Sequence, residues 1–315
     1  MGLTRLAPSP TGALHLGNAR TFLINWLDAR IHHRKVILRI EDIDSPRIKS
    51  GSHTQTLADL RWLGLDWDFG PVFQSQNLPR YRIAVDMLLA SHAAYPCVCS
   101  RSEVDSAASA PHASDGATVY PGTCRNRFPS PAAALAATGR HPTLRFRLPS
   151  THFTFVDDFR GKVTIPTDTL GDFPVLKADG TPAYQLACAI DDADSGVTHV
   201  VRGDDLLDSV PRQALLLHAL GLAGRVPRYT HVPLVLGPDG RRLAKRHGDT
   251  RLATHRAHHS SPDRVLSLLA RWSGITQPIP TPRSAADLLP HFNLDRVPRT
   301  PITMTPDDEQ FLRGT

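Results

Sequence analysis

RLAPSPTGALHLGN, from Arg5 to Asn18, ends a short apolar strand in a turn rich in proline and glycine, and places His15, Gly17 and Asn18 at the start of an amphipathic helix. The first N–H groups of a helix lack partners within the helix and, with the helix dipole, attract anions such as phosphate. Gly17 lets a flat or charged ligand approach the backbone, and His15 and Asn18 can hydrogen-bond to phosphate oxygens. The stretch predicts an anionic ligand over a strand-to-helix turn, although an ordinary loop before a helix has the same composition.

Strand-like and helix-like segments alternate around this stretch. Periodicity predicts strands at 3–7, 36–40 and 198–202, and helices at 18–32, 53–63, 79–93, 209–220 and 262–273. This alternation predicts an α/β fold with a parallel sheet covered by helices on both faces. Such sheets bind ligands at the carboxyl ends of their strands, where RLAPSP and the later segment RIEDID both lie.

An insertion separates the two halves of this pattern. Residues 96–190 carry strand-like stretches and two segments rich in alanine, serine and proline; the strands are expected at 144–148, 153–156 and 162–165, and the two segments are 105–118 and 129–139. After the helix at 262–273, the proline-rich residues 278–302 contain one short helical candidate, at 283–290. The chain therefore divides into a split α/β unit, an insertion and a C-terminal extension.

Composition limits the partners and the compartment. The 315 residues include 36 Lys and Arg against 30 Asp and Glu, a net charge of +6, which suits a polyanionic partner, although many basic enzymes never bind RNA. No apolar run approaches the roughly 20 residues of a membrane span, and the N-terminus has no signal-peptide segment. We expect a soluble, cytoplasmic monomer with reduced cysteines.

Three of the four cysteines are clustered in metal-ligand spacing, as Cys97-Val98-Cys99 and then Cys124 at the end of YPGTC. Three thiolates suit a tetrahedral zinc site, which needs a fourth ligand. Nearby candidates are Tyr120, His112 and His92. Tyrosine is an unusual zinc ligand, so the residues alone favour His112; three buried cysteines without a metal are the alternative.

Two other groups invite a functional interpretation. His255, His258 and His259 resemble a metal cluster but have no cysteine or carboxylate in a suitable register, so we expect a solvated surface that could face RNA. Cys188 lies four residues beyond Tyr184 and could border a pocket, although a small buried apolar role is expected.

A second motif, RRLAKRHGD at 241–249, offers Lys245 on a loop. Together, HLGN at 15–18 and RLAKR at 242–246 resemble the HIGH and KMSKS signatures of class I aminoacyl-tRNA synthetases. Asn18 stands in place of the second histidine, and Ala244 and Arg246 stand in place of the two serines. His15, Gly17 and Lys245 match the signatures, which implies an adenylate-forming enzyme that uses ATP with Mg²⁺.

Further motifs resemble the glutamyl and glutaminyl branch of this family: RIEDID at 39–44, LGLDWD from Leu63 and VVRGDDLLDS from Val200, in that order. A glutamyl-tRNA synthetase carries a large helical anticodon-binding region after its lysine loop, whereas about 65 residues follow here. The chain thus resembles the truncated paralogues that attach glutamate to queuosine in the anticodon of tRNA(Asp). Alternatives are a minimal glutamyl-tRNA synthetase that charges the 3′ end and an inactive paralogue that binds RNA or a protein.

The resemblance implies roles for individual residues. The amino-acid pocket would contain Arg5, Ser9, Glu41, Tyr184 and Arg202, and two arginines argue for an acidic side chain, because glutamine would leave a buried guanidinium without a counter-charge. His15, Asn18 and Lys245 would be catalytic, stabilising charge on the phosphates, and these three with Gly17 would bind ATP.

The resemblance also implies the metal ligands and the domains. The family pattern is CxC followed by Tyr-x-x-x-Cys, so Tyr120 becomes the fourth ligand of a structural zinc with Cys97, Cys99 and Cys124. The implied domains are a split Rossmann-like catalytic domain at 1–95 and 191–250, a zinc-bearing, acceptor-binding-like insertion at 96–190, and a short helical extension at 251–315 that resembles a stem-contact region, without an anticodon-binding domain.

Overall fold

A computed structural model describes residues 2–10, 14–43, 51–107, 119–243, 250–259, 261–276 and 281–314. The N-terminal strands form a parallel sheet in the order β1-β2-β3, with bounds β1 Leu3–Leu6, β2 Lys35–Ile40 and β3 Phe69–Phe73. Both expected strands of this region, 3–7 and 36–40, are confirmed to within one residue at each end. The central part of β2 is fully buried, as its apolar sequence requires.

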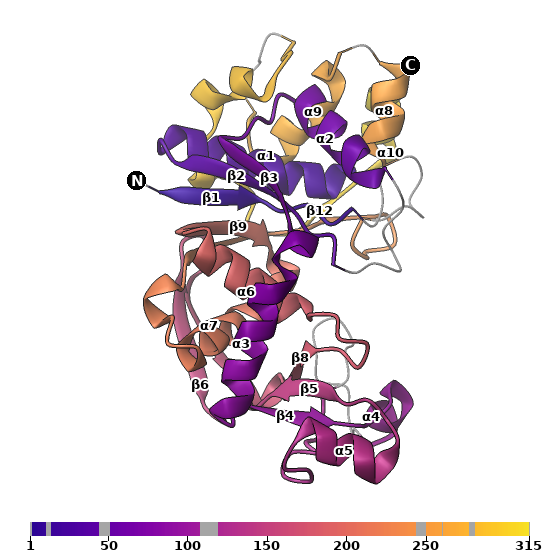
Figure 1. The fold of residues 1–315 in the computed structure, drawn as a ribbon. Helices are drawn as coiled ribbons and strands as arrows, with labels where there is room; N and C mark the ends of the chain where they lie inside the picture. The colour runs from indigo at the N-terminus through magenta and orange to yellow at the C-terminus, as the bar shows by residue number, and fades with distance from the viewer. Residues whose placement is uncertain are drawn as a thin grey trace.

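A second sheet, in the order β7-β6-β10-β9, lies against the first; its strands are β6 His152–Asp157, β7 Gly161–Pro166, β9 His199–Gly203 and β10 Arg228–Val232. Both β6 and β9 run parallel to β10. The two sheets meet where the backbone N–H of Thr198 donates to the Leu3 carbonyl at 2.9 Å. Strand β9 therefore lies beside β1 (Figure 1). The β6–β7 hairpin, within the range expected for the insertion, thus pairs with a strand of the split α/β unit.

The expected helices are present; their bounds are α1 Leu16–Ile31, α2 Ser52–Trp62, α3 Leu78–Ala90, α7 Ser209–Ala219 and α9 Asp263–Trp272. Helix α1 begins two residues before the expected position because the His15 side chain accepts from the N–H of Asn18 and so caps the helix. Helix α6, Tyr184–Asp194, was not expected from the sequence; it packs against α3 and α7.

A third sheet is antiparallel, with the order β4-β5-β8 and the bounds β4 Ala94–Cys97, β5 Thr143–Phe146 and β8 Phe173–Leu176. It lies at the lower end of Figure 1 with α4, Arg101–Ala107, and α5, Pro131–Thr138. Helix α5 occupies the low-complexity segment 129–139. Ser130 caps its first turn, Pro131 occupies a first-turn position that needs no N–H, and Gly139 ends it at φ +69°.

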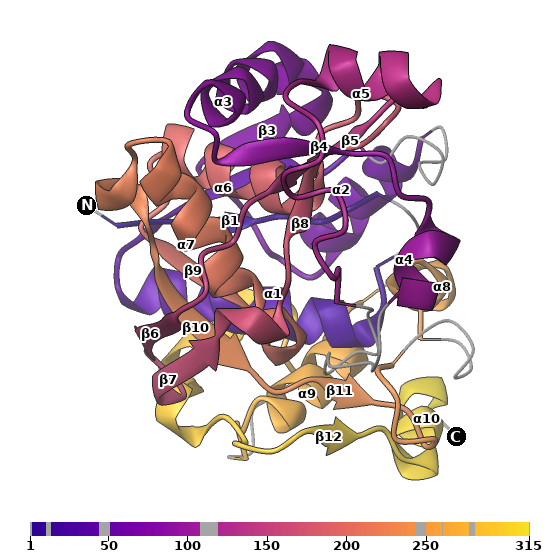
Figure 2. The same cartoon turned by 90° about the horizontal axis from the view of Figure 1, so that it is seen from below.

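The C-terminal extension lies at the end of the molecule opposite α3 and α5 (Figure 2). It contains α8 Leu252–His258, α9 and α10 Pro306–Arg313, and the short strand β12, Ile302–Thr303, pairs with β11, Val235–Leu236. The short helix expected at 283–290 is present as a 3₁₀ helix, Ala285–His291. It contains Pro290, which lacks the N–H that an α-helical hydrogen bond would need there.

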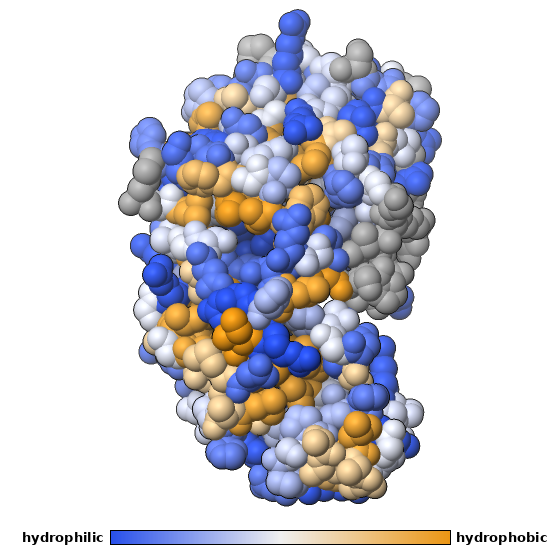
Figure 3. All heavy atoms as spheres, viewed as in Figure 1, coloured by the Kyte–Doolittle hydropathy of each residue, from blue (hydrophilic) through white to orange (hydrophobic). Residues whose placement is uncertain are grey.

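Among the described residues, none of the helices combines the length and hydropathy needed to span a bilayer. On the face shown in Figure 3, apolar patches are separated by hydrophilic side chains, with a strongly hydrophilic band across the middle of the molecule. In the part of the chain that the structure describes, the largest apolar cluster is internal and unites α1 and α9 with the first sheet and the C-terminal extension.

Candidate active site and cysteine cluster

The carboxyl ends of three parallel strands bring the predicted amino-acid ligands together. Arg5 is in β1, Glu41 directly follows β2, and Arg202 is in β9; all three are at least nine-tenths buried. With Tyr184, the first residue of α6, they line one pocket, here called the strand-end pocket. The side-by-side placement of β1, β2 and β9 therefore unites residues that lie almost 200 positions apart.

The predicted nucleotide ligands His15, Gly17 and Asn18 border the same pocket. Nδ1 of His15 accepts from the backbone N–H of Asn18 at 3.4 Å, which orients the ring at the start of α1. A Cβ on Gly17 would lie 3.2 Å from two ring atoms of His15, so glycine leaves room for this ring. Lys245 lies outside the described residues, as do Ala244 and Arg246.

Ser9 and Cys188 both contact Glu41. The Ser9 hydroxyl donates to Oε2 of Glu41 at 3.4 Å, and the Cys188 thiol donates to Oε1 at 3.2 Å. Ser9 is exposed, whereas Cys188 is buried, as the sequence predicts. These contacts hold the Glu41 carboxylate from two sides.

A buried ion network beneath the pocket was missed by the sequence analysis. Arg39 donates to Asp192 at 2.6 Å and to Glu41 at 3.1 Å, and Nε of Arg5 lies 3.3 Å from Asp192. Burial alone would lower the pKa of Arg39, but Asp192 and Glu41 outweigh burial and raise it well above its ordinary value. Arg39 is the first residue of RIEDID, a signal that could have identified it; Asp192 has no comparable signal in the sequence.

The pKa values of two buried carboxylates in this network are shifted in opposite directions. Burial is the largest influence on the pKa of Asp192 and raises it, but Arg39 and Arg5 together lower it below its ordinary value. For Asp191 burial prevails and raises the pKa, although Arg39 and Gln74 act against it. Arg39 and Arg5 therefore stabilise the charged form of Asp192 beneath the pocket.

Arg202 has partners that the sequence did not indicate. Its Nε donates to Nε2 of His231 at 3.0 Å, and its Nη1 donates to Oε1 of Gln213 at 3.0 Å. Nδ1 of His231 lies 2.6 Å from Oδ2 of Asp157. Within the described part of the chain, Nη2 of Arg202 is buried without a hydrogen-bond partner. An arginine donor in this position suits the carboxylate of a ligand.

The mouth of the strand-end pocket is bordered by Asp205, after β9, and by Arg242. Nη1 of Arg242 donates to Oδ2 of Asp205 at 2.5 Å, which ties the beginning of the lysine loop to the end of β9. Tyr184 also borders a neighbouring cavity whose cationic lining residues are Arg145, Lys177 and Arg212. Tyr184 therefore lines both the strand-end pocket and this basic cavity.

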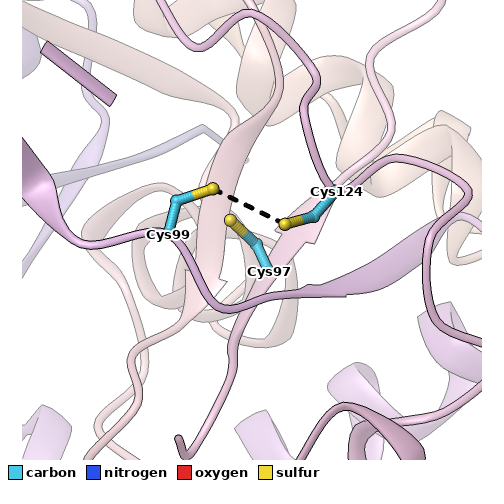
Figure 4. A group of neighbouring side chains, drawn as sticks. All are labelled: Cys97, Cys99 and Cys124. Carbon is cyan, nitrogen blue, oxygen red and sulfur yellow. Dashed lines mark hydrogen bonds between the residues drawn. The ribbon is translucent and has the colours of Figure 1, made fainter. Parts of the chain in front are cut away.

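The three clustered cysteines point toward one another (Figure 4). Their sulfur atoms all lie within 4.8 Å of one another, so this group could hold a metal ion. The Tyr120 hydroxyl oxygen lies 3.2 Å from Sγ of Cys97 and 3.7 Å from Sγ of Cys99, and it accepts from the N–H of Cys124 at 2.8 Å. His112 lies outside the described residues, and His92 lies in the turn after α3 with φ +57°.

His255, His258 and His259 line a separate cavity between α8 and α10, together with Glu309 and Arg313. The rings of His255 and His259 are parallel, with centroids 6.5 Å apart. Helix α8, which carries two of these histidines, lies in the upper part of Figure 1, whereas β4, which ends at Cys97, lies at the lower end.

Arginines at the carboxyl ends of parallel strands, beside the start of a helix, place the site where open α/β sheets bind ligands. A family model described as "tRNA synthetases class I (E and Q), catalytic domain" matches residues 3–277. The chain belongs to this glutamyl and glutaminyl family of class I tRNA synthetases.

Individual relatives refine this placement. The chain is 49% identical to a Glutamyl-Q tRNA(Asp) synthetase of Symbiobacterium thermophilum, with 98% of each chain covered. It is 40% identical to a Glutamate--tRNA ligase 1 of Acidithiobacillus ferrooxidans, covering 96% of this chain and 64% of the relative. A crystal structure of a glutamate tRNA ligase from Elizabethkingia meningosepticum, in complex with its amino acid, superposes with a TM-score of 0.81 at 29% identity, covering 99% of this chain and 68% of the other.

Proposed function

We propose that this chain activates L-glutamate with ATP and transfers it to queuosine in the anticodon of tRNA(Asp). The observation that carries the proposal is the strand-end pocket, in which Arg5, Glu41 and Arg202 meet beside the start of α1. The higher identity to the Symbiobacterium relative than to the Acidithiobacillus relative supports queuosine instead of a 3′-terminal adenosine as the acceptor.

In the first step, an oxygen of the glutamate α-carboxylate attacks the α-phosphorus of ATP, and the bond to the β-phosphate breaks as pyrophosphate leaves. His15 and Asn18, at the start of α1, and Lys245 would stabilise charge that develops on the phosphates. Mg²⁺ bound with ATP would supply further charge neutralisation on the pyrophosphate oxygens. In the second step, an RNA hydroxyl attacks the carbonyl carbon of the mixed anhydride, loses its proton and displaces AMP.

Glutamate would be held by charge complementarity. The unpartnered Nη2 of Arg202 would donate to the side-chain carboxylate, with Arg5 beside it, and Glu41 would accept from the α-ammonium. Tyr184 would cover the bound amino acid, and Ser9 would hold Glu41. No side chain needs to act as a nucleophile.

The acceptor nucleoside would enter through the basic cavity next to Tyr184. Arg145, Lys177 and Arg212 would contact phosphates of a splayed, single-stranded anticodon loop. In this proposal the inserted domain is 96–190, the split catalytic domain is 1–95 with 191–250, and the extension is 251–315.

The cysteine cluster would hold one structural zinc. Cys97, Cys99, Cys124 and Tyr120 supply four donor atoms in close proximity, which fits a closed tetrahedral site with no open position. Bound there, zinc would link the end of β4 to the loop that contains Cys124, and no catalytic step is assigned to it.

Activation is tested by glutamate-dependent ATP–pyrophosphate exchange, with and without tRNA. We expect exchange without tRNA, and Lys245→Ala should reduce it by roughly 10²-fold, since charge stabilisation at the transition state is worth about 3 kcal/mol. Lys162→Ala, in the β6–β7 hairpin, is the matched control. Undetectable exchange with glutamate would favour an inactive RNA- or protein-binding paralogue.

The acceptor is tested by offering labelled glutamate with three RNAs: tRNA(Asp) containing queuosine, the same tRNA without queuosine, and tRNA(Glu). We expect transfer only to the first, and digestion with mass spectrometry should locate glutamate on queuosine. Label on the 3′ adenosine of tRNA(Glu) would identify a minimal glutamyl-tRNA synthetase instead.

A further inference from the structure

Arg202 reaches the strand-end pocket with two of its three guanidinium nitrogens already bound. Both partners, the His231 ring and the Gln213 amide, are side chains from the protein interior, and His231 is fully buried. The third nitrogen, Nη2, has no hydrogen-bond partner among the described residues. The direction of the unused N–H groups is therefore determined by these two contacts.

The contact with His231 specifies which ring nitrogen carries the proton. Arginine can only donate, so Nε2 of His231 must accept and must be unprotonated. A neutral ring then carries its proton on Nδ1, which donates to Oδ2 of Asp157 at 2.6 Å. Burial lowers the pKa of His231, and the positive charge of Arg202 adds to this effect against Asp157, so the ring is neutral at pH 7.

Asp157 is held so that it can serve only as an acceptor toward this ring. Its other oxygen, Oδ1, accepts from the backbone N–H groups of Phe159 at 3.0 Å, Arg160 at 2.8 Å and His231 at 3.2 Å. The residue is 1% exposed. Three backbone donors thus fix the carboxylate and leave Oδ2 for Nδ1–H of His231.

The partners of Arg202 are both neutral, which has a consequence for specificity. A neutral imidazole and an amide orient the guanidinium but do not neutralise it, in contrast to Arg39, whose contacts are carboxylates. No described carboxylate forms a salt bridge with Arg202, and Asp192 acts on it only at longer range, so a carboxylate ligand gains from its charge where an amide does not.

We propose that Asp157, by holding His231 in its Nδ1-protonated form, positions Arg202 to recognise the side-chain carboxylate of the amino-acid substrate. The inference rests on the proposed function, since it takes Arg202 as the ligand of that carboxylate. Asp157 and His231 are positioning residues. They reach the substrate only through Arg202.

The proposal is tested with Asp157→Asn, which preserves the shape of the side chain. The three backbone donors will retain the carbonyl oxygen at the Oδ1 position, so the amide NH₂ of the variant faces Nδ1 of His231. The ring must then accept at Nδ1 and carry its proton on Nε2, where it opposes the Nε–H of Arg202. We expect the KM for glutamate in pyrophosphate exchange to rise at least tenfold, with kcat and the KM for ATP within twofold.

A second measurement reports directly on the relay, by which we mean the contacts from Asp157 through His231 to Arg202. ¹⁵N NMR of histidine-labelled protein should show His231 protonated on Nδ1 in the parent chain and on Nε2 in Asp157→Asn. His231→Gln, made with Asp157 intact, should retain much of the glutamate affinity, because its carbonyl can accept from Arg202 while its NH₂ donates toward Asp157. Asp158→Asn is the matched control, since Asp158 instead pairs with Arg228 at the surface at 2.6 Å.

Several results would overturn the inference. One such result is a parent chain in which His231 is protonated on Nε2. Another is an unchanged KM for glutamate in Asp157→Asn, although the proton of His231 has moved to Nε2. A parallel loss of kcat and of both affinities with an unchanged tautomer would indicate a structural role alone. A parent chain without glutamate-dependent exchange would instead contradict the proposed function, and the NMR result would still report whether the relay exists.

Discussion

Nη1 of Arg39 donates to Oδ1 of Asp192 across 2.6 Å, although 153 residues separate the two. The contact joins β2 to α6 beneath the strand-end pocket, and both side chains are almost completely buried. Asp192 also lies 3.3 Å from Nε of Arg5, so a single carboxylate supports two arginines. The position of Arg5 in the pocket therefore depends on charges that do not line it.

Removing Arg39 should destabilise the protein strongly. Arg39→Met leaves Asp192 and Glu41 buried without their main counter-charge, and breaking a buried ion pair on one side costs about 3–5 kcal/mol. Urea denaturation should show this decrease in the free energy of unfolding. Arg80→Met is the control, because Arg80 pairs with Asp194 near the surface and should contribute less than about 1 kcal/mol. Similar losses in both variants would contradict the role of the buried network.

Metal content should depend on the clustered cysteines. We expect about one zinc per chain by elemental analysis, and Cys97→Ser combined with Cys99→Ser should abolish it, since hydroxyl groups replace two thiolate ligands. Tyr120→Phe should weaken zinc binding less, because water can take the vacated position. Cys188→Ser, which alters the cysteine outside the cluster, should retain the metal. Full retention in the double variant would contradict the assigned ligands.

A glycine after α9 should be sensitive to substitution. A Cβ on Gly274, which has φ +80°, would lie 2.1 Å from the carbonyl oxygen of Arg296. Gly221 has a similar φ of +73° but open space around it. Gly221→Ala should therefore cost only the left-handed strain of about 1–2 kcal/mol, and Gly274→Ala about 1–3 kcal/mol more. Equal decreases in the free energy of unfolding of the two variants, measured by thermal or urea unfolding, would show that the backbone at Arg296 shifts to make room at little cost.

Stability should decrease on acidification because of His231. Its pKa is lowered in the folded chain from the ordinary value of 6.5, chiefly by burial, so the unfolded chain binds a proton more readily. The contribution of the neutral ring is complete above pH 6.5 and is lost as the pH falls below it. The difference in unfolding free energy between the parent and His231→Gln should shrink toward pH 5, with a slope of up to about 1.4 kcal/mol per pH unit. A pH-independent difference would refute this titration.

Much of the fold follows from local patterns. Strands β1, β2 and β9 and helices α1, α3 and α7 occupy segments whose apolar periodicity predicts them. Helix α6 escaped prediction, because its buried face carries Asp191 and Asp192 where an amphipathic pattern would have apolar residues. The short helix expected at 283–290 is present as the 3₁₀ helix Ala285–His291, in which Pro290 cannot donate an α-helical hydrogen bond.

The sequence by itself determined the residue types that this chemistry requires: the RLAPSPTGALHLGN turn, two arginines with a glutamate, and cysteines spaced for a metal. Such features are local, so periodicity and spacing reveal them. Only the tertiary structure decided that β9 lies beside β1, that Asp192 supports Arg5 and Arg39, and that His231 and Asp157 hold Arg202. Those contacts join segments far apart in the chain, and a buried charge selects its partner by distance and desolvation, neither of which is encoded in local sequence.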